Sequence, residues 1–399
     1  MKKLFIIFAL LAIIRFSSNA QTAYITNSND NTVSVINVAT NTVSATIPVG
    51  NHPNGVSVSP DGSKVYVANA TSVSVINTAT NTVSATITFS TTLLGISVSP
   101  DGSKVYVTNW FDKNVSVINT ATNTVSATIS IGTNNPRGIS VSPDGSKVYV
   151  TNDTYGTVSV ISTATNTVSA TIAVGANLFG VSVSPNGGKV YVATGSTNTV
   201  SVINTATNTV SATIAVGASP IGVSVSPDGY KVYIANQGDN TVSVINTATN
   251  TVSATIAVGT YPYGVSVSPD GYNVYIANRG DNTVSVINTA TNTVSATIAV
   301  GNTPLAFGNF ISSYTTGLAS LSIEPVCIAV YPNPASNNIT IESPQQAIIE
   351  ISNIQGQVIK TFEAIENKTN IDITVFPSGV YFIKVKTEKG VAVKKFVKE

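Results

Sequence analysis

The chain has 399 residues, of which 43% are hydrophobic and 9% charged, and its 19 Lys and Arg nearly balance its 18 Asp and Glu. This composition excludes a disordered chain, which needs low hydrophobicity and high net charge, and a nucleic-acid-binding protein, which needs a clustered cationic surface. With Cys327 and His52 as the only residues of their types, an internal disulfide, a cysteine-rich metal cage and a multi-histidine zinc site are also excluded.

The first twenty residues have the pattern of a secretory signal peptide. Lys2 and Lys3 are followed by the apolar run Leu4–Ile14 and by Ser18-Asn19-Ala20, a small-residue cleavage site. The apolar run is too short to cross a bilayer, which needs roughly twenty apolar residues. We predict a signal peptide at residues 1–20 and an exported mature chain without a transmembrane segment.

An internal repeat organises the chain after the signal peptide. The segment Ala-Thr-Asn-Thr-Val-Ser-Ala-Thr-Ile occurs seven times, first at Ala39 and last at Ala290. A Tyr-(Val/Ile)-(Ala/Thr)-(Asn/Thr) element also occurs seven times. The tetrapeptide Ser-Pro-(Asp/Asn)-Gly begins, with spacings of 40, 43, 42, 42 and 42, at Ser59, Ser99, Ser142, Ser184, Ser226 and Ser268. This period is typical of one β-propeller blade, for which about 40–45 residues are expected.

Each repeat contains four segments in which hydrophobic and polar residues alternate, as in half-buried strands. In one repeat these segments are Gly222–Ser226, Lys231–Ala235, Thr241–Ile245 and Thr251–Val258. Pro227-Asp228-Gly229 joins the first two segments, and these residue types favour a tight turn. We therefore predict an all-β fold with four antiparallel strands in each blade.

The two ends of the repeat region predict how the ring closes. The first repeat begins at its second strand, Ala23–Asn27, whereas Thr303–Ile311 has a first-strand pattern that lacks the Ser-Pro-Asp-Gly turn. We expect these segments to share one composite blade, which gives a seven-bladed propeller over residues 21–311. Stacked blades bury Val and Ile stripes, at about 1.5–3 kcal/mol for each side chain. We expect small Ser and Ala residues to allow close approach near the axis.

These repeats resemble a known family. Tyr106-Val107-Thr108-Asn109 and Tyr149-Val150-Thr151-Asn152 spell the signature of the YVTN family of β-propeller repeats, and Val33–Gly50 with its six echoes resembles the remaining strands. The resemblance implies a seven-bladed propeller on a surface-layer or secreted protein. Related seven-bladed folds include lactone hydrolases and haem-containing reductases, but this chain lacks the Cys-x-x-Cys-His motif and the histidines of such reductases.

The composition changes after the repeats. No Glu occurs between Gln21 and Ile311, whereas Glu324–Glu399 contains seven Glu and eight Lys. We predict a linker at residues 312–327 and a separate domain at residues 328–399. Alternating segments between Gly and Pro turns predict a small β-sandwich there, and from these patterns alone an adhesive immunoglobulin-like module fits equally well.

Four motifs of this tail resemble the type A C-terminal sorting domain of type IX secretion substrates. They are Tyr331-Pro332-Asn333-Pro334, Asn353-Ile354-Gln355-Gly356-Gln357, Pro377-Ser378-Gly379-Val380-Tyr381 and Lys394–Lys398. The resemblance implies that the type IX secretion machinery is a partner. It also implies export through the periplasm of a Gram-negative bacterium, with the product secreted or held at the cell surface.

Comparison of the repeats with one another indicates where a ligand could bind. In antiparallel blades, the hairpins between second and third strands and the connectors between blades lie on one face, and these are the segments that differ among the repeats. Binding residues tend to lie on loops held by a rigid scaffold, and Trp, Tyr and Arg are frequent interface anchors. The candidate binding face comprises His52, Trp110, Phe111, Arg137, Tyr155, Phe179, Tyr261, Tyr263 and Arg279.

Two alternatives remain open for this face. Its loops could differ only because their sequence is unconstrained, with Tyr263 or Phe179 plugging the axial channel.

We expect the recurring Asp of the Ser-Pro-Asp-Gly turns to have a structural role, because a short polar side chain caps such a turn. His52 with Asp30 or Arg137 is the best catalytic grouping that the sequence offers, and it is a weak one.

The sequence favours a non-catalytic binding, adhesion or structural protein over a lactonase-like hydrolase that uses the axial channel. We predict no catalytic residue, no cofactor and no metal site. The expected ligand of the candidate binding face is a protein or a glycan, and the expected state is a monomer.

Overall fold

The computed structural model describes residues 21–132, 135–312, 328–343, 347–353, 357–364, 366–387 and 390–399. The regular secondary structure in these ranges consists of β-strands. None of the described segments is an apolar helix able to cross a membrane. The chain divides into two compact units, Met1–Gly317 and Leu318–Glu399. The predicted signal peptide and the predicted linker after residue 312 lie outside the described residues.

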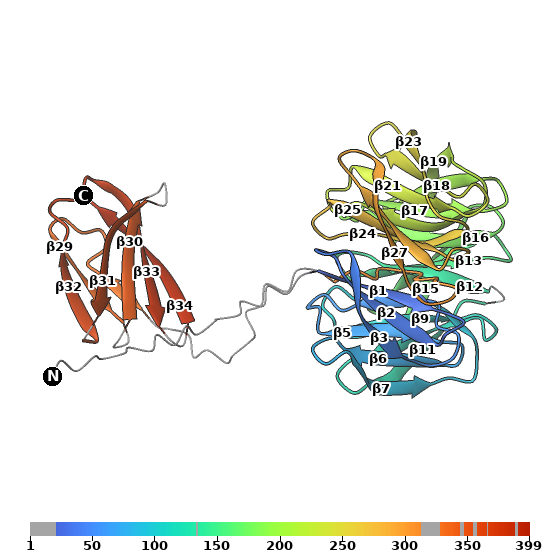
Figure 1. The fold of residues 1–399 in the computed structure, drawn as a ribbon, viewed down its shortest axis with the longest axis horizontal. Coiled ribbons are helices and arrows are strands. Elements are labelled where there is room, and N and C mark those ends of the chain that lie inside the picture. Colours follow the sequence, from blue (N-terminus) through green and yellow to red (C-terminus); the bar gives the residue numbers. More distant parts are fainter. Residues whose placement is uncertain are drawn as a thin grey trace, which may run out of the picture. The chain divides into compact units, whose positions relative to one another are not determined.

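Six blades of the first unit are four-stranded antiparallel sheets in which the strands follow one another in chain order (Figure 1). They are β4 (Val56–Val58), β5 (Lys64–Ala68), β6 (Ser72–Asn77) and β7 (Thr82–Thr88); β8 (Leu93–Val98), β9 (Lys104–Asn109), β10 (Asn114–Asn119) and β11 (Thr124–Ser130); β12 (Pro136–Val141), β13 (Lys147–Asn152), β14 (Thr157–Ser162) and β15 (Thr167–Ala173); β16 (Leu178–Val183), β17 (Lys189–Thr194), β18 (Thr199–Asn204) and β19 (Thr209–Ala215); β20 (Pro220–Val225), β21 (Lys231–Asn236), β22 (Thr241–Asn246) and β23 (Thr251–Ala257); and β24 (Pro262–Val267), β25 (Asn273–Asn278), β26 (Thr283–Asn288) and β27 (Thr293–Ala299). The first strands of successive blades contact one another, which places them around the central axis.

The seventh blade is composite, as predicted. Its sheet contains β1 (Thr22–Asn27), β2 (Thr32–Asn37) and β3 (Thr42–Pro48). The end of the repeat region pairs antiparallel with β1 through the bridges Ala23 to Ile311 and Asn27 to Pro304. The two ends of the propeller therefore close the ring within one blade, and the prediction of a seven-bladed propeller is confirmed.

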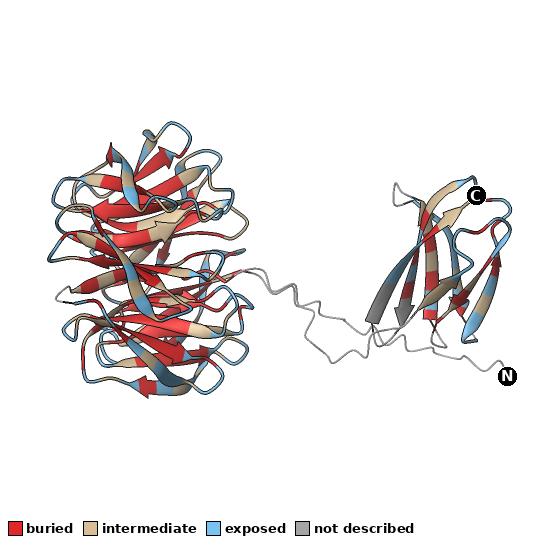
Figure 2. Ribbon diagram, turned by 180° about the vertical axis from the view of Figure 1, so that it is seen from behind, coloured by how far each residue is buried: buried red, intermediate tan, exposed pale blue. Residues whose placement is uncertain are grey.

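The hydrophobic core of the propeller lies between neighbouring blades. In one cluster, Tyr66 and Val75 of one blade pack with Ile96 and Val107 of the next blade. The outer strands alternate between exposed and partly buried residues, whereas the middle strands are buried over most of their length. Figure 2 shows the buried residues concentrated inside the blades and the exposed residues on the loops and outer strands. Each blade thus depends on its neighbours to remove its faces from water.

Glycine, rather than the expected Ser and Ala, allows the inner strands to approach one another. A Cβ on Gly95 would lie 2.4 Å from the carbonyl oxygen of Arg137, and one on Gly222 would lie 2.3 Å from that of Tyr263. Serine has a different role here, since the Ser57 hydroxyl accepts a 3.2 Å hydrogen bond from the Val98 amide of the next blade. Backbone therefore packs directly on backbone around the axis.

The second unit is a sandwich of two antiparallel sheets. Their strands are β28 (Ala329–Tyr331), β29 (Asn338–Glu342) and β32 (Lys368–Asp372) in one sheet, and β31 (Val358–Ala364), β30 (Ala347–Asn353), β33 (Gly379–Thr387) and β34 (Gly390–Lys398) in the other. Ile339 and Ile371 of the first sheet pack with Ile349, Ile383 and Phe396 of the second in one buried cluster. This arrangement confirms the predicted β-sandwich.

The Tyr-Pro-Asn-Pro segment holds the last strand of this sandwich. The Asn333 side chain donates a 3.1 Å hydrogen bond to the Lys395 carbonyl and accepts one of 2.9 Å from the Val397 amide. The Ala335 amide donates to the Val397 carbonyl at 2.9 Å. Two of the motifs that carry the sorting-domain resemblance are therefore in direct contact.

Candidate functional site

The hairpins and connectors that differ among the repeats share one face of the propeller, here called the variable face. The Trp110 amide, in the β9–β10 hairpin, donates a 2.9 Å hydrogen bond to the Thr92 carbonyl in the connector before β8. The Arg279 amide, in the β25–β26 hairpin, donates a 3.0 Å hydrogen bond to the Tyr261 carbonyl in the connector before β24. These contacts fix the loops to each other, so the face is built on a rigid frame.

Five connector residues on this face have left-handed backbone conformations: His52, Asn177, Ser219, Tyr261 and Thr303. The φ angle is 48° at His52 and 51° at Tyr261, where non-glycine residues are uncommon. At these two residues a neighbouring hairpin holds the conformation, because Asn31 Oδ1 accepts from the His52 amide at 2.8 Å and Asn240 Oδ1 accepts from the Tyr261 amide at 2.9 Å. Both of these connectors are therefore locked in place by an asparagine of the preceding blade.

Three aromatic side chains of the variable face are open to solvent. Phe111 is 69% exposed, and Tyr155 and Tyr261 are each 58% exposed. Large apolar side chains on locked loops lose little conformational freedom when they bind a partner. The position of these residues is therefore suited to recognition.

Arg137 organises the strongest cluster on this face. Its Nη1 atom lies 2.9 Å from Asp153 Oδ2, and the two side chains are 23% and 14% exposed. The guanidinium carbon lies 3.9 Å from the centre of the Phe179 ring and 5.6 Å from the centre of the Trp110 ring. Both distances are within the range of cation–π attraction. Three adjacent blades, which begin with β8, β12 and β16, contribute these four residues.

Asn135 ties the two hairpins of this cluster together. Its Nδ2 donates to the Trp110 carbonyl at 3.1 Å, and its Oδ1 accepts from the Thr154 hydroxyl at 3.1 Å. Its carbonyl accepts from the Asp153 amide at 3.1 Å. The indole and the carboxylate are therefore held at a defined separation by one side chain and its backbone.

A hydrophobic plug lies next to this cluster. Ile221, Tyr263, Leu305 and Phe307 are buried against one another, and Phe179 packs on them. The rings of Tyr263 and Phe307 meet edge to face with centres 5.8 Å apart. With 8% of its surface exposed, Tyr263 lies in the plug rather than on the open part of the face.

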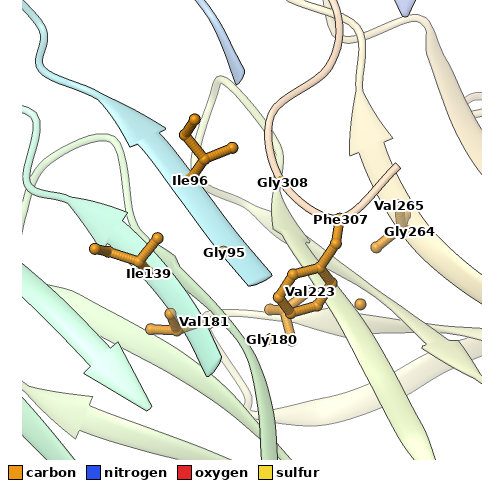
Figure 3. A pocket seen from close by; sticks show the side chains of 12 residues that line it. Gly95, Ile96, Ile139, Gly180, Val181, Val223, Gly264, Val265, Phe307 and Gly308 are labelled. Atoms are coloured by element: carbon orange, nitrogen blue, oxygen red, sulfur yellow. The ribbon is translucent and has the colours of Figure 1, made fainter. Parts of the chain in front are cut away.

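The centre of the ring holds only a small cavity of about 20 Å³. It is lined by inner-strand residues that include Ile96, Ile139, Val181 and Val223, and by Phe307 of the closing segment. Figure 3 shows these side chains on neighbouring strands, with Phe307 extending among them from the closing segment. Since one water molecule needs about 10–15 Å³ of such space, the cavity has no room for an organic substrate.

The remaining candidates lie apart from the Arg137 cluster. His52 and Arg279 are exposed. The two groups proposed as partners of the His52 side chain are engaged elsewhere. The Asp30 carboxylate accepts a 2.7 Å hydrogen bond from the Asn302 amide, which lowers its pKa, and Arg137 pairs with Asp153. Within the described ranges, no group of three His, Cys, Asp or Glu side chains is placed to hold a metal ion.

The sequence comparison missed two exposed tyrosines on the opposite face. Tyr230 and Tyr272 are each 70% exposed and follow the Ser-Pro-Asp-Gly turns of two adjacent blades. At the same turn position, three other blades have Ser63, Ser103 and Ser146. The signal was present as a Ser-to-Tyr change in loops that otherwise repeat.

The recurring Asp of these turns has the structural role expected for it. In the turn that begins at Ser99, hydrogen bonds from the Ser99 hydroxyl and from the Ser103 amide and hydroxyl lower the pKa of Asp101 to about 2. Asp144 has the same partners in its own turn, Ser142 and Ser146, and its pKa is also lowered to about 2. These carboxylates stay ionised at neutral pH and cap their turns.

Three family models match parts of the chain. The secretion system C-terminal sorting domain matches residues 329–399, the YNCE-like β-propeller matches residues 170–279, and the seven-bladed β-propeller lactonase matches residues 77–176. No curated protein matches the sequence.

Two solved structures are similar to the chain. Hydrazine synthase of Kuenenia stuttgartiensis is 27% identical, with a TM-score of 0.64 over 67% of this chain and 92% of that one. A functionally unknown protein from Desulfotomaculum acetoxidans is 17% identical, with a TM-score of 0.62 over 72% of this chain and 99% of that one, which shows the shared fold alone.

The fold and these matches define a class of protein: a secreted seven-bladed β-propeller. Its C-terminal sandwich is a sorting domain of the type IX secretion system. The protein is therefore located outside the cell or at the cell surface, and its tail interacts with the secretion machinery.

Proposed function

We propose that the propeller is a non-catalytic binding module whose ligand contacts the variable face. The observation that carries this proposal is the combination of exposed aromatic residues and locked loops on one face. Phe111, Tyr155 and Tyr261 stand on connectors and hairpins that hydrogen bonds fix to the blades. The sorting domain directs the protein out of the cell, where extracellular proteins and glycans are available as ligands.

A hydrolase that uses the axial channel is the alternative, because one family model that matches is that of a lactonase. The size of the central cavity, about 20 Å³, argues against it. The walls of that cavity are Gly, Ile, Val and Phe residues, which supply no general acid or base. The test is a screen of lactones and esters with the chain and with His52→Ala, where we expect the same background rate from both.

Binding is tested with the chain from Gln21 onward against panels of extracellular proteins and glycans. We expect the triple variant Phe111→Ser, Tyr155→Ser, Tyr261→Ser to lose binding, by about tenfold or more in affinity, since buried aromatic anchors dominate most interfaces. The matched control is the double variant Tyr230→Ser, Tyr272→Ser, which removes comparably exposed rings from the opposite face. If both variants bind with the same affinity, the variable face is not the binding site.

A further inference from the structure

We propose that Arg137, Asp153 and Trp110 form a subsite for a neutral sugar ring, an inference that rests on the binding role proposed for the variable face. In this subsite two adjacent hydroxyl groups of a pyranose bridge the ion pair, and the C–H face of the ring lies against the indole. The ligand class is thus an uncharged glycan.

The hydrogen-bonding capacity of the ion pair is only partly used. A guanidinium has five N–H donors, and within the described residues only Nη1 of Arg137 has a hydrogen bond, to Asp153 Oδ2 at 2.9 Å. That bond is also the only one to the Asp153 carboxylate in the described part of the chain, which leaves Oδ1 to accept from a ligand. A donor and an acceptor side by side match the two hydroxyls of a vicinal diol, each of which both donates and accepts.

The charge of the pair selects against ionic ligands. Arg137 and Asp153 together have no net charge, and they neutralise each other at 2.9 Å. An anionic ligand on Arg137 would be repelled by Asp153, and a cationic ligand on Asp153 would be repelled by Arg137. A polar ligand without charge avoids both penalties.

The aromatic groups provide the apolar half of the subsite. Phe179 lies 3.9 Å from the guanidinium carbon and holds that group in a fixed orientation. Trp110 is 5.6 Å away and half-buried, and the exposed Phe111 and Tyr155 belong to the same two hairpins. A sugar ring has hydroxyls at its edge and C–H groups on its faces, so it needs both kinds of surface.

The subsite is organised before any ligand binds. Asn135 joins the Trp110 carbonyl, the Thr154 hydroxyl and the Asp153 amide, so that the hairpins of two blades cannot separate freely. Preorganisation lowers the entropy that binding costs. This is the expected design for a shallow site that binds a small polar ring.

The test is calorimetric titration of the chain from Gln21 onward with neutral oligosaccharides derived from mannan, glucan, xylan and galactan, and with oligogalacturonate as the anionic comparison. We expect at least one neutral oligosaccharide to bind with a Kd below about 1 mM. We expect Trp110→Ala and Asp153→Asn each to weaken that binding by about tenfold or more. Thermal unfolding checks that the variants are folded, and Tyr272→Ala on the opposite face is the matched control.

Three outcomes would overturn the proposal. The first is the absence of binding to every neutral oligosaccharide at about 10 mM, and the second is unchanged binding by both variants. The third is a preference for oligogalacturonate that Asp153→Asn strengthens, which would indicate an anion site. If a protein ligand is found instead, and the Phe111, Tyr155, Tyr261 triple variant loses it, the sugar subsite is wrong while the binding role of the variable face stands.

Discussion

The amide of Tyr24 donates a 2.9 Å hydrogen bond to the carbonyl of Phe310, and this contact joins the first strand of the propeller to its last segment. The Thr22 amide supports the contact through a 2.9 Å bond to the Ser312 hydroxyl, as does the Ala306 amide through a 2.8 Å bond to the Thr26 hydroxyl. Because this pairing completes the seventh blade, it contributes to the stability of the whole propeller.

The closure predicts a large effect of Phe310→Ala. Phe310 is fully buried, so its truncation should lower the free energy of unfolding by about 3–5 kcal/mol. Urea unfolding followed by circular dichroism measures the change. Phe111→Ala, at a ring that is 69% exposed, is the control and should shift stability by about 0.5 kcal/mol or less. Equal midpoints for the two variants would show that the closing segment contributes little.

The axial glycines predict a second difference in stability. Gly222→Ala places a methyl group 2.3 Å from the Tyr263 carbonyl oxygen, so the two inner strands must separate. We expect a loss of about 1–3 kcal/mol, the usual range for overpacking, at the upper end because the clash is with backbone. Gly132→Ala is the matched control, since nothing lies within 4 Å of its added Cβ and only its φ of 77° is unfavourable, at about 1 kcal/mol. The prediction fails if the control is the less stable variant.

The buried tyrosines predict alkaline unfolding. Burial raises the pKa of Tyr24, Tyr66 and Tyr233 to about 12, from a usual value of about 10. Because the folded state disfavours the ionised phenol, this contribution to stability is complete below pH 10 and is lost as the pH rises toward 12. We expect cooperative loss of structure in that window, together with a burst of tyrosinate absorbance.

A single substitution tests this linkage. Tyr233→Phe removes one buried titrating group whose hydroxyl has no hydrogen-bond partner among the described residues, so the fold should tolerate it. The loss of stability above pH 10 should become less steep, whereas Tyr272→Phe, at a side chain that is 70% exposed, should leave the slope unchanged. Ionisation of all tyrosines near pH 10 with the fold intact would contradict the assignment.

The contact between Asn333 and the last strand predicts an effect on export. Asn333→Ala removes two hydrogen bonds to β34, each worth about 0.5–1.5 kcal/mol. The amides of Lys395–Lys398 should then exchange faster with solvent, and the fraction of the protein outside the cell should fall. Asn338→Ala, at an exposed position of β29, is the control. If the amides of the last strand exchange faster while export stays normal, the order of this strand is not required for sorting, and the prediction is wrong.

Much of the fold followed from patterns that are local in the chain. The spacing of the Ser-Pro-Asp-Gly turns predicts the blade, and the strand-like segment Thr303–Ile311 predicts the closure, because both depend on strand alternation and turn chemistry. The Arg137 cluster could not be predicted from local patterns in the same way. Arg137 and Asp153 belong to one blade, but Trp110 and Phe179 come from its two neighbours, so their contact depends on how blades stack.

Tyr261 and Tyr263 show what the sequence predicts and what only the tertiary structure determines. They are two positions apart, with Tyr261 on the connector before β24 and Tyr263 in that strand, and the sequence places both on the same face. Only packing makes one of them 58% exposed and buries the other to 8% against Phe307, a residue from the closing segment. Repetition and alternation, which act between residues close in the chain, determined the blades and the ring, and the motifs of the tail identified it through their resemblance to a sorting domain. The tertiary structure decided which side chains are exposed to solvent and which contact each other across blades. The reason is that these contacts depend on how closely neighbouring blades pack, and the sequence of a single repeat does not contain that distance.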